Sequence, residues 1–300
     1  MIVILGATGN TGSVAATTLL ARGENVRAVG RRPERLKKLA EQGAAVFTGD
    51  VLDTEAMTRA FTGARAAYLM IPPDFTQADM LGYQARVADS LARAAEQAGL
   101  THAVTLSSVG AQLPAGAGPI SGLHHFEQRI NQVRGLNVLH LRPGYFFENF
   151  LMQIGAIRQF GMMGGSMRGD LAIAMLATRD IGVRAAEALS RLDFTGLQTR
   201  ELLGPRDLSL QEAAAILGRA IGQPELRYQQ MPYETFQALL TQMGLSPDGA
   251  QRINEMYRAF NEGRVVPQEK RGTDNTTPTT LEQWANEVFA PAFRGQGVGA

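Results

Sequence analysis

A seven-residue segment near the start of the chain, Gly6-Ala-Thr-Gly-Asn-Thr-Gly12, constrains the fold more than any other feature. It follows an apolar run, Met1 to Leu5, and precedes a helical pattern from Ser13 to Arg22. Glycines let a backbone turn tightly and let a phosphate approach it closely, and the start of a helix offers unpaired N–H groups with a partial positive charge. The segment therefore predicts a strand, a turn and a helix that bind the pyrophosphate of a dinucleotide. The predicted contacts are Gly6, Thr8, Gly9, Asn10, Thr11 and Gly12.

Composition and charge exclude several classes of function. The chain of 300 residues carries a net charge of +1, so no overall field favours nucleic acid or an acidic membrane. Its apolar runs fall well short of the roughly 20 residues that span a bilayer. Cysteine is absent, which removes disulfides, thiolate metal ligands and cysteine nucleophiles, and we expect no metal site. Because a strand starts at the first residue, we expect no signal peptide, and the absence of cysteine fits the expected cytoplasmic protein.

The first half of the sequence alternates short apolar runs with longer amphipathic segments. Six runs predict strands: Ile2–Leu5, Asn25–Gly30, Ala44–Thr48, Ala66–Ile71, His102–Ser107 and Asn137–Leu141. The segments between them predict helices near Gly12–Arg22, Pro33–Gln42, Asp53–Phe61, Phe75–Ala98 and His124–Val133. Such alternation implies right-handed crossovers and a parallel sheet with helices on both faces. The predicted fold class is α/β, a doubly wound Rossmann sheet in the order 3-2-1-4-5-6 that binds ligands at the carboxyl ends of its strands.

The second half changes character and predicts a smaller, mostly helical C-terminal lobe. We expect residues 1–150 to form the dinucleotide-binding domain, with 175–205 returning to it, and residues 151–174 and 206–300 to form the lobe. In this half, Gly161–Ser166 is expected to be a flexible loop and Arg200–Gly204 a seventh, edge strand. The predicted helices are Asn149–Phe160, Thr178–Arg191 with Thr178 as cap, one opened by the capping box Ser209–Glu212, Tyr233–Met243, Gly249–Glu262, and a last one from the box Thr279–Glu282 to Phe289.

The residues after the second predicted strand indicate which dinucleotide is bound. NAD-specific sites place an acidic residue here to accept the ribose hydroxyls, whereas an arginine suits the 2′-phosphate of NADP. This chain has Gly30-Arg-Arg-Pro33 and no acid before Glu34. Arg31 is the predicted 2′-phosphate contact and Arg32 a candidate to stack on the adenine, which favours NADP(H) over NAD(H). The alternative is that both arginines are solvated side chains at a helix start.

Three further strand ends supply candidate cofactor contacts. Asp50, directly after the third strand, is placed to accept a hydrogen bond from the adenine amino group, with Val51 against the ring. At the end of the fourth strand, Ile71 and Pro72 are predicted to form a stiff wall beside the cofactor. Ser107 ends the fifth strand, where we expect the chemistry of such a fold to take place.

Four segments together resemble the NmrA-like family of atypical short-chain dehydrogenases and reductases. They are Gly6–Gly12, Val26–Arg32, Gly49–Asp53 and Leu141–Asn149, which stand in the family's order and span about half of the chain. The resemblance implies a Rossmann fold that binds the dinucleotide. The family includes NADPH-dependent quinone, azo-dye and triphenylmethane reductases, and also proteins that bind the dinucleotide as redox sensors or transcriptional co-regulators.

The residue pair that catalytic short-chain dehydrogenases use is missing. Those enzymes employ a tyrosine as general acid and a lysine one turn later, which the resemblance places between residues 115 and 135. That stretch contains neither residue type, and the chain's lysines are Lys37, Lys38 and Lys270. His124 and His125 stand there instead, and either is a candidate proton donor near neutral pH. The alternative is that one packs beneath a loop and the other is solvated; Glu127 is interpreted as a helix-surface or capping group.

Aromatic and methionine residues beyond the sixth strand predict an apolar pocket for a flat acceptor. The candidates are Tyr145, Phe146, Phe147, Phe150, Met152, Met162, Met163 and Met167. The alternative is that half of them are ordinary core between the lobe and the sheet. A conjugated acceptor suits a site without a tuned acid, because it delocalises the charge that arrives with the hydride while solvent supplies the protons.

Two hypotheses of different classes follow. The first is an NADPH-dependent oxidoreductase that reduces a small quinone-like, azo or similar dye-like acceptor, with no direct nucleic-acid partner and no membrane partner. The second is a sensor that binds NADP(H) with little or no catalysis, changes shape at the loop Pro114–Pro119 and binds a protein partner. The missing tyrosine and lysine favour the sensor, and the predicted apolar pocket favours the enzyme. An epimerase-like activity on nucleotide sugars is disfavoured because it needs the missing pair.

Overall fold

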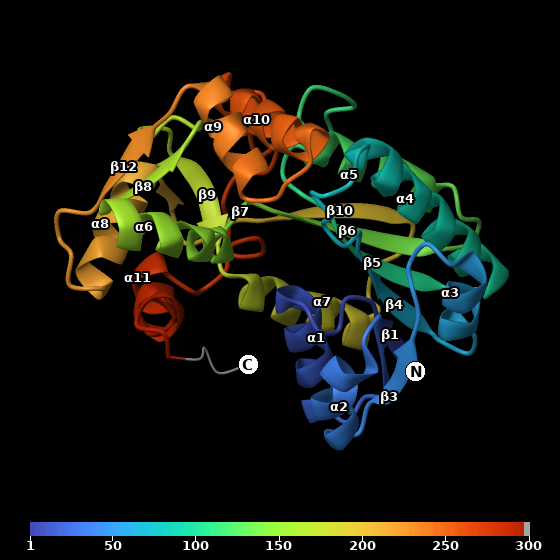
Figure 1. Ribbon diagram of the computed structural model, residues 1–300. Helices are drawn as coiled ribbons and strands as arrows, with labels where there is room; N and C mark the ends of the chain where they lie inside the picture. Colours follow the sequence, from blue (N-terminus) through green and yellow to red (C-terminus); the bar gives the residue numbers. More distant parts are fainter. Residues whose placement is uncertain (297–300) are drawn as a thin grey trace.

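The computed structural model describes residues 1–296. Seven strands form one parallel sheet in the order β10-β6-β5-β4-β1-β2-β3 (Figure 1). These strands are β1 (Ile2–Ile4), β2 (Val26–Gly30), β3 (Ala45–Thr48), β4 (Ala66–Leu69), β5 (His102–Leu106), β6 (Asn137–Pro143) and β10 (Leu197–Leu202). In the register of the central strand, Ile2 lies opposite Val26 on one side and Ala66 on the other. The predicted order is confirmed, and so is the seventh, edge strand, although it spans Leu197–Leu202 rather than Arg200–Gly204.

Helices cover both faces of this sheet, as predicted. One face carries α1 (Asn10–Ala21), α2 (Pro33–Glu41) and α7 (Thr178–Arg191), and the other carries α3 (Thr54–Phe61), α4 (Met80–Gln97) and α5 (Pro119–Asn131). Each face buries its own apolar cluster, which explains why the strands are almost continuously hydrophobic. Helix α7 comes from the second half of the chain and packs against α1.

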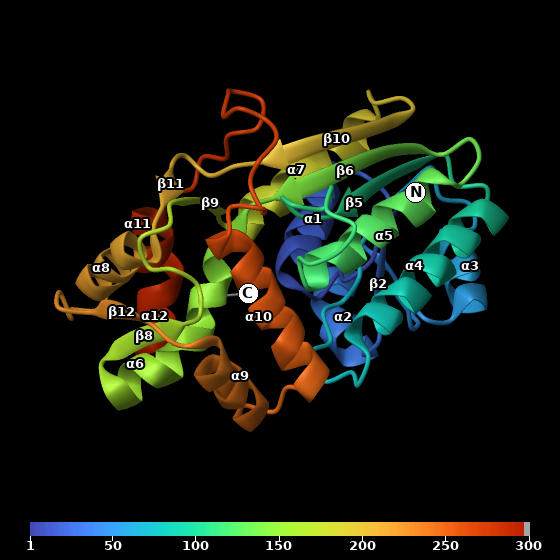
Figure 2. The ribbon, with the colours of Figure 1, turned by 90° about the horizontal axis from the view of Figure 1, so that it is seen from above.

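The lobe stands beside the sheet and contains more strand than predicted (Figure 1). Its elements are β7 (Tyr145–Phe146), the 3-10 helix η1 (Phe147–Gln153), α6 (Ile154–Phe160), β8 (Met162–Gly165), β9 (Ile173–Leu176), β11 (Asp207–Leu208), α8 (Leu210–Ala220), β12 (Arg227–Gln230), α9 (Tyr233–Gln242), α10 (Pro247–Asn261), α11 (Leu281–Trp284), the π-helical turn η2 (Ala285–Phe289) and α12 (Ala290–Phe293). The strands form two small sheets, β11-β9-β7 and β12-β8. The predicted helix Asn149–Phe160 is split between η1 and α6. Figure 2 shows α10 passing beside α5, between the rest of the lobe and the Rossmann sheet.

The prediction of a flexible loop at Gly161–Ser166 is wrong. Most of that segment is strand β8, which pairs in parallel with β12 from much later in the chain. A Cβ atom on Gly164 would lie 2.4 Å from the Met231 side chain, and one on Gly165 would lie 2.8 Å from the Tyr228 hydroxyl. The glycines therefore permit close packing here rather than flexibility, and the partner that imposes it is remote in sequence.

Helix α4 begins at Met80 rather than at the predicted Phe75. The Asp79 side chain caps it by accepting from Gly82 N at 2.9 Å, and the carboxylate of Asp248, from α10, accepts from Met80 N at 2.8 Å. The five residues before the cap, 74–78, belong to no helix or strand. Two carboxylates, one local and one from the lobe, thus fix where the helix starts.

Other helix starts agree with the predictions to different degrees. Helix α5 begins at Pro119, so His124 lies in its second turn and not at its start as predicted. The capping box Ser209–Glu212 is confirmed at the start of α8. Helix α9 is confirmed, and α10 begins at Pro247, two residues before the predicted Gly249.

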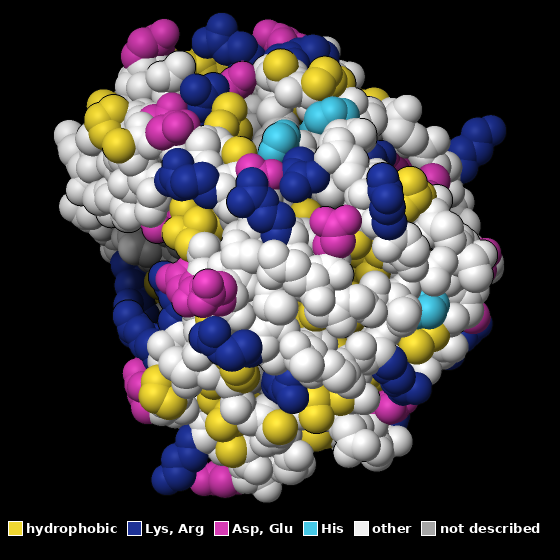
Figure 3. Space-filling view, turned by 90° about the vertical axis from the view of Figure 1, so that its right-hand side faces the viewer, with side chains coloured by type: hydrophobic (Ala, Val, Ile, Leu, Met, Phe, Trp, Pro, Cys, Tyr) yellow, Lys and Arg dark blue, Asp and Glu magenta, His cyan; other side chains and the backbone are white. Residues whose placement is uncertain are grey.

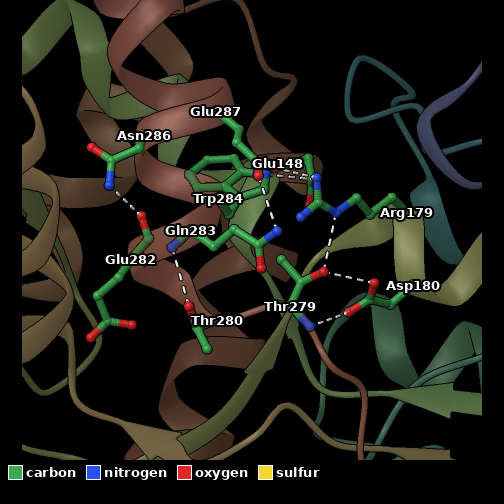
Figure 4. Close-up of polar contacts among 10 residues, drawn as sticks. All are labelled: Glu148, Arg179, Asp180, Thr279, Thr280, Glu282, Gln283, Trp284, Asn286 and Glu287. Atoms are coloured by element: carbon green, nitrogen blue, oxygen red, sulfur yellow. Dashed lines mark hydrogen bonds and ion pairs between the residues drawn. The ribbon is translucent and has the colours of Figure 1, made fainter.

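The predicted cap of α7 is wrong, and its replacement connects the lobe to the sheet. Thr178 is the first helical residue and its side chain makes no capping bond. Instead, Glu148 Oε2 accepts from Thr178 N at 3.0 Å. The other oxygen, Glu148 Oε1, accepts from Trp284 Nε1 at 3.1 Å (Figure 4). One carboxylate therefore holds together the start of α7 and the buried tryptophan of α11.

The second predicted capping box, Thr279–Glu282, is wrong, because the N-cap is Thr280, which accepts from Gln283 N. Thr280 caps α11, whereas the Thr279 hydroxyl donates to Asp180 Oδ1 at 2.8 Å (Figure 4). Close by, Arg179 on α7 forms a 2.5 Å ion pair with Glu287. These contacts, together with Glu148, fix the last helix of the lobe against α7 and set the position of the lobe relative to the sheet.

Candidate functional site

A cavity of about 1500 Å³ lies between the carboxyl ends of the sheet strands and the lobe. Its walls come from the segments that follow β1 to β6 and from η1, α6, α9 and α10. Pockets for small ligands typically enclose about 300–1000 Å³. The cavity is therefore large enough for a dinucleotide and a second molecule, and it lies where the doubly wound fold binds ligands.

The glycine segment forms one end of the cavity. Gly6 has a positive φ of +61°, and Gly9 N donates to Gly6 O at 2.8 Å, which closes the turn before α1. No side chain within residues 1–296 caps α1, and its first turn has no acidic residue, so its N–H groups remain available to an anion. A Cβ atom on Gly12 would lie 2.3 Å from Gly6 O. This close backbone packing fits a pyrophosphate cradle. Gly12 packs against the backbone of the turn, and the cavity is lined by Gly6, Thr8, Gly9, Asn10 and Thr11.

The segments after β2 and β3 extend this end. Arg31, Asp50 and Val51 line the cavity, and Arg31 is exposed. Hydrogen bonds from Thr76 and Gln77 lower the pKa of Asp74 across the cavity, and the charge of Arg31 lowers it further. Arg31 thus presents a positive charge to the cavity where a 2′-phosphate is predicted. Arg32 lies at the N-cap position of α2 and not among the described residues that line the cavity, so the structure gives its predicted stacking role no support.

The middle of the cavity is bounded by the ends of β4 and β5. Ile71, Pro72 and Ser107 line it, and their contact with the cofactor stays a prediction. The Ser107 hydroxyl donates to Glu127 Oε1 at 2.5 Å, and Arg142 Nε donates to the same oxygen at 2.8 Å. Glu127 is 2% exposed, so its interpretation as a surface or capping group is wrong. In the sequence, the signal that could have indicated the Glu127–Arg142 pair is the position of Arg142 in the family-like segment Leu141–Asn149.

The structure does not bring the two candidate histidines to the cavity. The Nδ1 atom of His124 lies 2.8 Å from the carbonyl oxygen of Ala111, and His125 is exposed. Neither is among the described residues that line the cavity, because α5 turns Ile120 and Leu123 toward it instead. Their role as proton donors stays a prediction, and this placement does not favour it.

The other end of the cavity is apolar. Of the eight aromatic and methionine candidates, four line it and four are buried in the lobe core. The lining residues are Tyr145, Phe146, Met152 and Met162, and the core residues are Phe147, Phe150, Met163 and Met167. The placement of Phe150 in the pocket is therefore wrong, because its ring is only 1% exposed and packs in the lobe core against Tyr145. Sequence reasoning missed the lining residues Met231, Phe236, Met243, Tyr257 and Phe260.

Two tyrosines, Tyr145 and Tyr257, line this apolar end. Tyr145 from β7 and Tyr257 from α10 lie close to each other, and Asn149 lies beside Tyr145. Burial, reinforced by the neighbouring Tyr257, raises the pKa of Tyr145 well above its usual value. Both hydroxyls therefore keep their protons at neutral pH and are available as hydrogen-bonding groups in an otherwise apolar wall.

The mouth of the apolar end exposes large hydrophobic side chains. Met152 is 59% exposed, Phe160 61% and Met243 54%, and all three line the cavity. On the side of the molecule that carries α3 and α4, by contrast, basic and acidic side chains are interspersed (Figure 3). An apolar rim around an open cavity is typical of a binding site.

Two searches of residues 1–296 bear on the other function classes. No helix there has the length and apolar character needed to cross a membrane. No group of three or more histidine, aspartate or glutamate side chains there is placed to hold a metal ion.

Comparisons with known proteins agree with this geometry. The model of the NmrA-like family matches residues 1–285. The chain is 28% identical over 259 residues to an NAD(P)H azoreductase from Xenophilus azovorans, covering 86% of each protein. It is 29% identical over 252 residues to quinone oxidoreductase 2 from Escherichia coli, covering 83% of this chain and 84% of that one. A crystal structure of an NADPH-dependent quinone oxidoreductase from Escherichia coli, complexed with NADPH, superimposes with a TM-score of 0.82 at 26% identity, covering 96% of this chain and 100% of that one.

Proposed function

We propose that this chain, which belongs to the NmrA-like family, is an NADPH-dependent oxidoreductase that reduces a conjugated acceptor such as a quinone or an azo compound. The observation that carries the proposal is the continuity of the cavity, which joins a dinucleotide cradle to an apolar chamber. The relatives named as a quinone oxidoreductase and an azoreductase support it across more than four-fifths of the chain.

The residues at the glycine end bind and select the cofactor. The backbone from Gly6 to Gly12 and the start of α1 hold the pyrophosphate, and Arg31 pairs with the 2′-phosphate that distinguishes NADPH from NADH. Asp50 and Val51 contact the adenine. When bound, NADPH supplies a hydride.

The residues at the apolar end orient the acceptor and exclude water from its faces. Phe146, Phe236 and Met162 offer flat or adaptable surfaces for a planar ring system. The hydroxyls of Tyr145 and Tyr257 are placed to bond a polar atom of the acceptor. Protons reach the reduced acceptor from solvent through the open mouth, which requires no histidine in the cavity.

A dinucleotide sensor is the second candidate function. The observation that favours it is the lack of a tyrosine–lysine pair in α5, together with two histidines that point away from the cavity. The loop Pro114–Pro119, where a change of shape was expected, is held by α10 and its following turn, because Arg264 Nη1 donates to Gly116 O at 2.8 Å and the backbone of Gly118 packs against that of Arg252. A loop held in this way is not expected to change shape as the sensor requires, so this contact favours the enzyme.

Steady-state oxidation of NADPH against a panel of quinones, azo dyes and triphenylmethane dyes tests the proposal, alongside a fluorescence titration of NADPH binding. We expect turnover with at least one acceptor class and a preference for NADPH over NADH. Tight NADPH binding without turnover across the panel would favour the sensor. Failure to bind either dinucleotide would contradict both candidate functions.

A further inference from the structure

Three side chains form a buried chain of hydrogen bonds that ends at the middle of the cavity. Ser107 Oγ lies 2.5 Å from Glu127 Oε1. Arg142 contacts both oxygens of the same carboxylate, with Nε 2.8 Å from Oε1 and Nη2 2.5 Å from Oε2. Ser107 is 3% exposed and the side chain of Arg142 14%. Since Ser107 N also donates to Leu141 O at 2.8 Å, the serine is fixed by its backbone and by its hydroxyl.

The charges in this chain determine which way the serine hydroxyl points. Arg142 Nε and Nη2 donate to Oε1 and Oε2 of Glu127, so both oxygens of this side chain act as acceptors toward a guanidinium that can only donate. The hydrogen bond with Glu127 raises the pKa of Arg142, and the carboxylates of Glu201 and Glu269 raise it further, so the arginine stays charged. The single proton of the Ser107 hydroxyl must therefore lie on the side of Glu127. The Ser107 oxygen therefore presents only its lone pairs to the cavity.

We propose that the Glu127–Arg142 pair is a positioning device that makes Ser107 an acceptor-only group, and that this group accepts a hydrogen bond from the nicotinamide riboside half of the dinucleotide. In this arrangement Ser107 cannot donate a proton or a hydrogen bond to the acceptor substrate. The inference rests on the dinucleotide site of the proposed function and adds Glu127 and Arg142 to it as residues that act through Ser107.

The sheet order places Ser107 beside that half of the dinucleotide. The chain reverses its direction of winding between β1 and β4, so a dinucleotide on the glycine segment crosses the sheet there. Arg31 and Asp50 follow β2 and β3 on one side, where the adenosine 2′-phosphate is proposed to bind. Ser107 follows β5 on the opposite side.

The nicotinamide riboside half offers two kinds of donor to such an acceptor. One is the carboxamide N–H and the other is a ribose hydroxyl, and an acceptor-only serine suits both. Because a carboxylate fixes the hydroxyl, the acceptor is preorganised before the ligand arrives, which lowers the entropic cost of binding.

Binding measurements on Ser107→Ala test the inference without using turnover. We expect the affinity for NADP⁺ to fall about 10-fold, the loss expected for one hydrogen bond, while the affinity for adenosine 2′,5′-bisphosphate, which lacks the nicotinamide half, stays unchanged. Ser107→Thr keeps the hydroxyl and should retain most of the affinity. An equal loss for both ligands, or no loss for NADP⁺, would overturn the inference.

Glu127→Gln tests the positioning role. It should weaken NADP⁺ but not the bisphosphate, and in combination with Ser107→Ala it should cause no further loss, because both changes remove the same contact. Asp89→Asn is the matched control. Asp89 on α4 forms a 2.5 Å ion pair with Arg129, which lies on α5 like Glu127 but outside the cavity. Breaking this pair should leave NADP⁺ binding unchanged. Additive losses in the double variant would contradict the positioning role. If Glu127→Gln does not fold, the Ser107→Ala result still decides the acceptor claim.

The 3-acetylpyridine analogue of NADP⁺, in which a methyl group replaces the carboxamide nitrogen, distinguishes the two donors. If Ser107 accepts from the carboxamide, Ser107→Ala should no longer weaken binding of this analogue. If it accepts from the ribose, the loss should persist at about 10-fold. A failure of the proposed reductase activity would leave these binding results intact, so the two claims fail separately.

Discussion

The two ends of the cavity differ in the atoms that form them, which are mainly backbone at the dinucleotide end and mainly side chains at the acceptor end. At the dinucleotide end, the backbone of one continuous segment supplies the pyrophosphate cradle, and the packing is so close that Gly12 has no room for a Cβ atom. At the acceptor end, side chains from η1, α6, α9 and α10 converge from residues scattered over more than a hundred positions, and several of them are largely exposed. A backbone site tolerates little change, whereas a side-chain site can be altered one residue at a time. Acceptor preference can therefore vary in this fold while the cofactor site stays the same.

The largest effect is expected from a side chain added at the dinucleotide end. In Gly12→Val, the Cβ position 2.3 Å from Gly6 O forces the cradle apart, and binding of NADPH should weaken by about 1000-fold or become undetectable. Gly155→Ala at the acceptor end is the control, because a Cβ there meets nothing within 4 Å and NADPH affinity should not change. Fluorescence titration with circular dichroism as a check on folding measures both. Near-normal NADPH binding by folded Gly12→Val would contradict the account of the cradle.

A smaller loss is expected from reversing one charge at the same end. Arg31→Asp replaces attraction by repulsion at the proposed 2′-phosphate position, so NADPH affinity should fall by about 100-fold while NADH affinity changes far less. Arg32→Asp makes the same charge change next to the cavity but outside its lining, and its effect should be much smaller. Isothermal titration with both dinucleotides checks this. An equal loss for NADPH and NADH would refute the 2′-phosphate contact.

The stability of the sheet that carries the dinucleotide end should also depend on pH, through a buried histidine that has no counterpart in the lobe. His140 on β6 is buried, with Nδ1 2.7 Å from Thr105 Oγ1 and Nε2 2.8 Å from Asn131 Oδ1, and burial lowers its pKa to about 4. Below pH 6.5 the unfolded chain takes up a proton on this histidine that the folded chain does not. The free energy of unfolding should therefore fall by about 2 kcal/mol between pH 7 and pH 5.

Urea unfolding at several pH values measures this dependence. His140→Gln should flatten the slope of stability against pH in this window, whatever it does to the stability at pH 7. An unchanged slope in the variant would assign the effect to other groups. The histidines of the chain all lie before residue 141, so none in the lobe contributes.

The smallest effect is expected at the mouth of the acceptor end. Phe160 is 61% exposed and lines the cavity, so Phe160→Ser should raise the KM for a large apolar acceptor about five-fold and leave NADPH affinity and stability unchanged. Leu197→Ser on the edge strand β10 removes a similarly exposed side chain away from the cavity and should leave KM unchanged. A change in NADPH affinity in Phe160→Ser would break the proposed separation between the two ends.

The difference between a site made of one segment and a site made of remote side chains also explains which features the sequence could predict. The strand order, the edge strand and the glycine turn follow from local patterns, because each is encoded by neighbouring residues with the right period or the right glycines. The cavity-lining positions of Arg31, Asp50 and Ser107 follow from one rule about strand ends in such sheets. The pocket residue Tyr145 was found because it belongs to a cluster of aromatic and methionine residues beyond the sixth strand.

What the sequence could not predict depends on partners that are remote along the chain. Strand β8 exists because β12 pairs with it, and Glu127 is buried because Arg142 compensates its charge. The direction of His124 depends on where α5 begins, and that start is set by Pro119 and not by a capping residue near the histidine. Tyr257 carries no local signal at all and reaches the cavity only through the packing of α10.

The account's central claim is that one cavity brings NADPH and a conjugated acceptor together for direct hydride transfer. Anaerobic single-turnover oxidation of NADPH by a quinone, with and without deuterium at the transferred position of C4, tests it most directly. The account predicts rapid oxidation that slows with the deuterated cofactor, in the wild-type chain and in Phe160→Ser at saturating quinone, and no oxidation in Gly12→Val. NADPH that binds tightly yet stays reduced in the presence of every quinone tried would contradict it.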